Sequence, residues 1–95
     1  MITKYDKYCI ICGTPTNTVH HLVFGRGKRN LADQDGLTAP MCPFCHEELH
    51  NKSAVANALS RIAGQLEFEK QQVAKGKSFD DAREEFRQRY GVSYL

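Results

Sequence analysis

Two Cys-x-x-Cys pairs constrain this chain more than any other feature of its sequence. Cys9 and Cys12 form the first pair, and Cys42 and Cys45 form the second after an insert of twenty-nine residues. A two-residue gap lets one turn present both sulfurs to the same ion, so two such pairs complete a tetrahedral thiolate site. The alternatives are two disulfides or four ordinary buried thiols. We expect one structural zinc ion that holds the two ends of the insert together.

The length of the chain favours the same interpretation. With 95 residues, 41% of them hydrophobic, it forms one small domain whose core alone is thin. Small domains commonly add disulfides or a structural metal. Neither an apolar signal-peptide core at the N-terminus nor a run long enough to span a membrane is found, so we expect a cytoplasmic protein. In that compartment paired cysteines bind zinc more often than they form disulfides.

The four histidines of the chain lie in two short segments beside the cysteine pairs. His20 and His21 form a doublet, and His46 and His50 follow the second cysteine pair. Residues four apart lie on the same face of a helix, so His46 and His50 can bind one ion. The alternative is that some of these histidines are spare zinc ligands or helix-surface residues. The concentration of all four in these segments favours a second metal site.

Local patterns predict most of the regular elements. We expect short strands over 19–24 and 37–41, and a helix that begins at Pro43 and continues through His50. Ser53 is the expected N-cap of an amphipathic helix that reaches about Ala74, with Gly64 as its weak point, and apolar residues recur along it: Val55, Leu59, Ile62, Leu66 and Val73. A last helix follows the capping residue Ser78 and ends at Gly91, with one face formed by Phe79, Ala82, Phe86 and Tyr90. Residues 25–30 read as a flexible basic loop, and residues 31–41 lack the pattern of a long regular element.

The cysteine pairs, the histidine doublet and the His46-x-x-x-His50 helix together resemble the HNH endonucleases, also called His-Me finger or ββα-metal nucleases. The similarity spans about Cys9 to His50, and the small members encoded by bacteriophages are the most similar. It implies an α+β fold, with a zinc-stabilised ββα-metal core in residues 1–52 and two C-terminal helices in residues 53–95 packed on it as a single domain. It also implies a hydrolase that cuts DNA in the host cytoplasm, leaving 5′-phosphate and 3′-hydroxyl ends.

The resemblance also implies roles for single residues. His21 would be the general base, and His20, His46 and His50 would bind one catalytic divalent cation, which could be Mg²⁺, Mn²⁺, Ni²⁺ or Zn²⁺. Because neighbouring side chains on a strand point to opposite faces, the roles of His20 and His21 could also be exchanged. The family's middle asparagine, which pins the loop that carries the base, has no counterpart here. Asp35, Asp33 or the backbone is the expected replacement, since Asn30 lies too close to the doublet.

Positive charge near the doublet adds a nucleic-acid-binding expectation, although the net charge of +2 alone does not indicate one. Arg26, Lys28 and Arg29 would contact the backbone of duplex DNA without reading its bases. Other basic residues are interleaved with acids and are expected on solvated faces: Arg61, Lys70, Arg83, Arg87 and Arg89. Two other functions fit the pattern, a non-catalytic zinc-bound nucleic-acid-binding module and an adaptor whose C-terminal helices dock a protein such as another phage protein.

Overall fold

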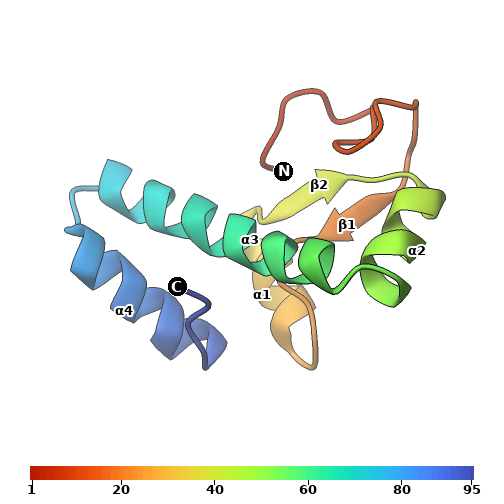
Figure 1. Ribbon diagram of the computed structural model, residues 1–95. Coiled ribbons are helices and arrows are strands. Elements are labelled where there is room, and N and C mark those ends of the chain that lie inside the picture. Colours follow the sequence, from red (N-terminus) through yellow and green to blue (C-terminus); the bar gives the residue numbers. More distant parts are fainter.

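The computed structural model describes residues 1–95 as a two-stranded antiparallel sheet surrounded by four helices, an α+β fold (Figure 1). The elements follow in the order β1 (Val19–His21), α1 (Lys28–Asp35), β2 (Thr38–Pro40), α2 (Pro43–Asn51), α3 (Ala54–Ala74) and α4 (Phe79–Tyr90). The long helix α3 runs across the molecule beside the sheet, and α4 returns along it. None of these helices is both long and apolar enough to cross a membrane.

The strands occupy only the central part of the spans expected from the sequence. In the sheet, His20 of β1 lies opposite Ala39 of β2. The backbone of the N-terminal segment lies along β2, where the Ile2 N–H donates to Thr38 O and the Ile10 N–H donates to Pro40 O, both at 2.8 Å. These bonds place the first cysteine pair beside the end of β2, from which the second pair begins.

Helix α1 corrects the expectation of a flexible loop followed by irregular chain. Residues 28–35 are helical, and glycines with positive φ stand at both ends, Gly27 at 78° and Gly36 at 69°. Only glycine adopts this left-handed conformation at little cost, so the pair defines where the helix begins and ends. The carboxylate of Asp35 accepts hydrogen bonds from Arg89 and Tyr90 on α4. These tertiary contacts stabilise a helix too short to be stable alone.

The remaining helix boundaries agree with the sequence patterns. Helix α2 begins at Pro43, as expected. The hydroxyl of Ser53 accepts the N–H of Ala56 at the start of α3, and α4 follows Ser78. Gly91 ends α4 with a φ of 78°. Local capping chemistry therefore sets these limits.

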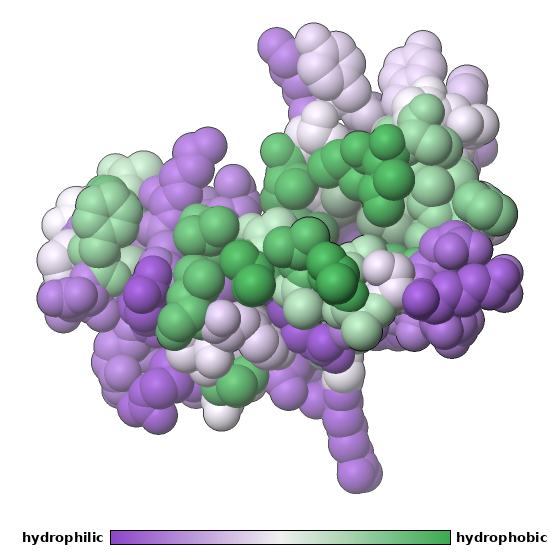
Figure 2. Space-filling model, viewed as in Figure 1, coloured by the Kyte–Doolittle hydropathy of each residue, from purple (hydrophilic) through white to green (hydrophobic).

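Helix α3 directs much of its apolar stripe toward solvent. Val55, Leu59 and Leu66 are 70%, 57% and 51% exposed, and Figure 2 shows hydrophobic residues gathered over α3. The buried positions of the helix include several polar residues: Ser60, Gln65, Glu69 and Gln72. Hydrogen-bond partners explain why two of these polar side chains are buried. The Gln65 side chain accepts the Tyr94 N–H, and the Glu69 carboxylate accepts hydrogen bonds from Arg83. Hydrogen bonding therefore decides which face of α3 is inward.

Hydrophobic packing joins the two halves of the chain. One cluster combines residues from both sides of position 53, namely Val23, Ala32, Leu37, Phe68, Phe86 and Tyr90. A second cluster surrounds the cysteines and includes Met41 and Leu49. On α4, Phe86 and Tyr90 face the core as expected, whereas Phe79 is 70% exposed. The helical extension is thus part of the same packed body as the sheet.

Gly64 marks the closest approach of α3 to the chain that follows β1. A Cβ atom at this position would lie 2.6 Å from Cγ2 of the fully buried Val23 and 3.1 Å from Cβ of Leu22. We expect Gly64→Ala to lower the free energy of unfolding by about 1–3 kcal/mol in urea denaturation, because overpacking outweighs the gain in helix propensity of about 1 kcal/mol. Ala58→Gly, at an exposed position of α3, is the matched control. If the protein is more stable with alanine than with glycine at position 64 as well as at position 58, α3 does not pack as closely on Val23 as described.

Candidate functional site

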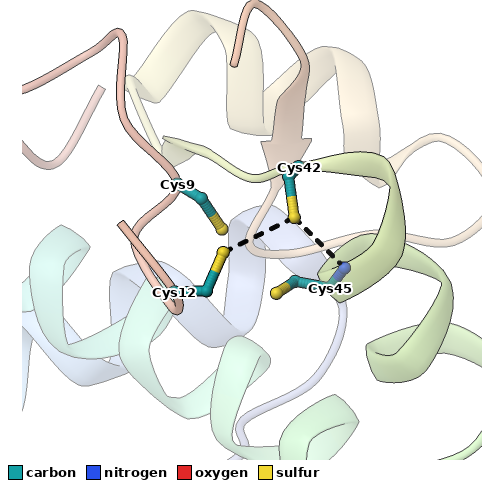
Figure 3. A group of neighbouring side chains, drawn as sticks. All are labelled: Cys9, Cys12, Cys42 and Cys45. Atoms are coloured by element: carbon teal, nitrogen blue, oxygen red, sulfur yellow. Dashed lines mark hydrogen bonds between the residues drawn. The ribbon is translucent and has the colours of Figure 1, made fainter. Parts of the chain in front are cut away.

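The four cysteines converge at one end of the molecule. Cys9 and Cys12 come from the turn before β1, Cys42 is the N-cap of α2 and Cys45 lies in its first turn, with the four sulfurs directed toward a common centre (Figure 3). All four are free thiols, and the four sulfurs lie within 4.8 Å of one another. This cluster could hold a metal ion such as zinc.

The sulfur spacing fits a shared ion better than a disulfide. Cys12 Sγ and Cys42 Sγ are 3.7 Å apart. Sulfurs bound tetrahedrally at about 2.3 Å from zinc stand roughly 3.8 Å apart, whereas a disulfide requires about 2.05 Å. Burial raises the pKa of the Cys9 thiol, but backbone N–H groups of Cys12, Cys42 and Ile11 outweigh it and lower the pKa to about 6. At Cys45 the effect of burial is the largest, and the pKa of this thiol is raised.

A second cluster brings together three of the four histidines. His20 from β1 and His46 and His50 from α2 each direct a ring nitrogen to within 4.8 Å of the others. The Nε2 atoms of His46 and His50 are 3.1 Å apart. Imidazole nitrogens bound tetrahedrally at about 2.0–2.1 Å from zinc stand roughly 3.3 Å apart. The spacing of four along α2 produces this convergence, as the sequence predicts.

The protonation of His20 follows from its hydrogen bonds. Its Nε2 lies 2.8 Å from the Ser60 hydroxyl, and that hydroxyl donates its single proton to Leu22 O, also at 2.8 Å. Nε2 must therefore carry a proton and donate to Ser60, which leaves a lone pair on Nδ1. Nδ1 is buried and has no hydrogen-bond partner. A metal ion would satisfy this atom, so the donor set fits a cation.

All three imidazoles of this cluster are held in the neutral form that binds metals. Burial, followed by the nearby His46 and His50, lowers the pKa of His20 to about 3. Burial and then the positive charge of Arg29 lower the pKa of His46. Burial, His46 and Arg29, in that order, lower the pKa of His50. A neutral imidazole keeps the nitrogen lone pair that coordination requires.

His21 lies outside this cluster but opens to the same cavity. Its Nε2 is 2.8 Å from Oδ1 of Asp33 on α1, and its side chain is 26% exposed. A cavity of about 140 Å³ is lined by the four histidines together with Val19, Phe24 and Arg29. The pleat of β1 therefore separates the doublet, with His20 in the metal-binding cluster and His21 beside it.

Some of the other residues expected at the site lie at the histidine cavity, and others do not. Arg29 lines the histidine cavity, whereas Arg26 and Lys28 do not. Asp35 contacts α4 rather than the doublet, and Asp33 is the acid that meets His21. Ser60 was not predicted from the sequence. The only signal for it there is a serine within an apolar helical stretch.

The bridging role of Ser60 leads to a measurable expectation. Ser60→Ala leaves the buried His20 Nε2 and Leu22 O without partners, so we expect a loss of about 1–3 kcal/mol in the free energy of unfolding. Nitrogen-15 shifts of the His20 ring should report the Nε2–H tautomer in the unsubstituted protein. Ser53→Ala, which removes only a helix cap, is the control for stability. An Nδ1–H tautomer would contradict the assignment of Nδ1 as the free ligand atom.

Comparison with known proteins gives a family for the chain. No curated protein and no solved structure matches it. A family model described as protein of unknown function (DUF968) matches residues 3–76, from before the first cysteine pair to the end of α3. The match includes every cysteine and histidine of both clusters, and it covers more than half of the chain. The chain therefore belongs to this family, protein of unknown function DUF968.

Proposed function

We propose that the chain is a metal-dependent DNA endonuclease or nickase with an HNH-type core. One observation carries the proposal. The unpartnered Nδ1 of His20, the paired imidazoles of His46 and His50, and the separately held His21 border one cavity. Metal-dependent hydrolysis of a phosphodiester uses these two parts, a cation site and a base that is not itself a ligand.

His21 is the proposed base, and its contacts indicate which atom acts. The carboxylate of Asp33 accepts from Nε2–H, so Nδ1 keeps its lone pair, and the structure gives that atom no hydrogen bond. Nδ1 takes the proton of a water molecule as the water oxygen attacks phosphorus. The bond from phosphorus to the 3′-oxygen breaks, its electron pair leaves with that oxygen, and solvent supplies the proton. The products are a 5′-phosphate and a 3′-hydroxyl.

The remaining residues of the cavity bind and orient the phosphate. A divalent cation bound by the three imidazoles would supply positive charge to a phosphate oxygen and to the departing 3′-oxygen. Arg29, which lines the cavity, is placed to bind a second phosphate oxygen. Arg26 and Lys28, at the start of α1, would contact the DNA backbone farther from the reacting bond.

The proposal is tested on supercoiled plasmid with Mg²⁺, Mn²⁺, Ni²⁺ or Zn²⁺. We expect the unsubstituted protein to produce nicked or linear DNA, and His21→Ala to lower the single-turnover rate by about 10²–10⁴-fold because general-base catalysis is lost. Arg87→Gln, on the exposed face of α4, is the control and should keep the rate.

Each other outcome has a distinct meaning. Equal cutting by the protein and His21→Ala would reject His21 as the base, or would show that a contaminating nuclease does the cutting. DNA binding without any cutting by the unsubstituted protein would reject catalysis and would favour the binding module.

We also propose that the cysteine cluster binds a structural zinc ion. It joins the turn before β1 to the start of α2, and α2 carries two of the proposed catalytic ligands. Because binding energy at such a site is folding energy, we expect a strong chelator to abolish the cooperative thermal transition in circular dichroism, and added Zn²⁺ to restore it. By elemental analysis, Cys42→Ser should lose this ion while His46→Ala retains it. An unchanged melt after exhaustive chelation would exclude a structural role.

A further inference from the structure

A second cleft adjoins the histidine cavity, and the sequence analysis gave it no role. It lies at the junction of α2 and α3 and has a volume of about 550 Å³. His50 lines both this cleft and the histidine cavity. The polar residues that line the rest of it are Asn51, Lys52, Ser53, Asn57 and Arg61. The two hollows therefore share a wall at a proposed metal ligand.

Arg61 lines the second cleft and is held from two sides. Its Cζ lies 4.2 Å from the centroid of the Phe24 ring, and its guanidinium donates a hydrogen bond to Oδ1 of Asn57. The Phe24 ring in turn packs edge to face against His50, with centroids 4.6 Å apart. The guanidinium is thus one phenyl ring away from the histidine cluster. Stacking fixes its plane and leaves its edge available for an anion.

The charge of Arg61 is not neutralised by an acid, in contrast to the arginines of α4. Arg83, Arg87 and Arg89 bind Glu69, Glu84 and Asp35 respectively. Arg61 contacts neutral side chains, namely the amide of Asn57, the ring of Phe24 and the phenol of Tyr94. The other two arginines without a carboxylate partner are Arg26 and Arg29.

Neither hollow is lined by an aspartate or a glutamate. One carboxylate reaches a residue of the second cleft, since Oε1 of Glu48 is 3.5 Å from Nζ of Lys52. Arginines without a carboxylate partner therefore stand on both sides of the histidine cluster, Arg29 in the first cavity and Arg61 in the cleft, and Lys52 adds an ammonium group that Glu48 partly neutralises. An anion with a single charge would need only one of these sites, whereas a chain of phosphates would use them all. Nucleic acid is such a chain, with one phosphate per 3.4 Å of axis on each strand.

We propose that this cleft binds the sugar–phosphate backbone on one side of the bond that is cut. Arg61 binds the phosphate next to the one at the histidine cluster, and Asn57, Asn51 and Lys52 contact the backbone beyond it. Arginine binds phosphate through two parallel N–H donors, and the amides and the ammonium group add contacts without base readout. This inference rests on the proposed function and adds the path of the substrate strand.

The test measures binding without cutting. A fluorescein-labelled duplex is titrated by anisotropy with the His21→Ala protein and with the double variants that add Arg61→Gln, Lys52→Gln or Arg87→Gln, from 50 to 200 mM salt. Each phosphate contact that is lost should reduce the slope of log K against log salt by about 0.9. We expect that reduction for Arg61→Gln, with at least about a fivefold loss of affinity at 100 mM salt, and a smaller loss for Lys52→Gln. Arg87→Gln removes the same charge from α4 and should bind as His21→Ala does.

The outcomes separate the cleft from the catalytic proposal. If Arg61→Gln and Lys52→Gln both match Arg87→Gln in affinity and slope, the cleft does not bind the backbone, even if plasmid cutting succeeds. If both weaken binding while the unsubstituted protein never cuts, the cleft stands and catalysis fails. Thermal melting checks that each variant is folded. Should Arg61→Gln unfold because Phe24 loses its partner, Lys52→Gln decides, since the Lys52 side chain is 61% exposed and forms a single ion pair, with Glu48.

Discussion

The histidine cluster depends on one buried hydroxyl. Ser60 lies forty residues after His20, yet it accepts the proton of the His20 ring and donates to the backbone of Leu22. Its position requires α3 to pass very close to the chain after β1, and Gly64, about one turn farther along, removes the side chain that would prevent this. Helix α3 is therefore part of the site. Residues 1–52 alone would leave His20 free to adopt the other tautomer and would remove the wall of the second cleft.

Features that depend on neighbouring residues could be predicted from the sequence. The two cysteine pairs, the His46 and His50 spacing, and the limits of α2, α3 and α4 all follow from local geometry and capping. Helix α1 could not be predicted in this way, because Asp33, Asp35 and Gly36 read as breakers until the bonds from Arg89 and Tyr90 are known. The buried face of α3 could not be predicted from the sequence either. Its polar residues are buried because their partners come from distant positions, such as Ser93 and Tyr94 for Gln65.

The separation of the histidine doublet has a simple geometric origin. Strand alternation, which made a common role for His20 and His21 difficult, sends His20 into the buried cluster and leaves His21 partly exposed beside it. Asp33 then meets His21 from α1, the helix absent from the sequence prediction. Asp35 lies two residues farther on and attaches α1 to α4, so it holds Asp33 in place without touching the doublet. Asp33 and Asp35, the two acids expected in place of the middle asparagine, therefore make different contacts, one with His21 and the other with α4.

The net charge of +2 conceals how the charges are distributed. Acidic residues neutralise arginines on α4, where Glu84 binds Arg87 and Asp35 binds Arg89. They are absent from the lining of both hollows at the histidine cluster, where Arg29 and Arg61 keep their charge available. The lining of these two hollows is therefore more positive than the net charge indicates. Such a lining attracts a polyanion over a distance of about 10 Å at moderate salt, and bulk composition alone would not indicate it.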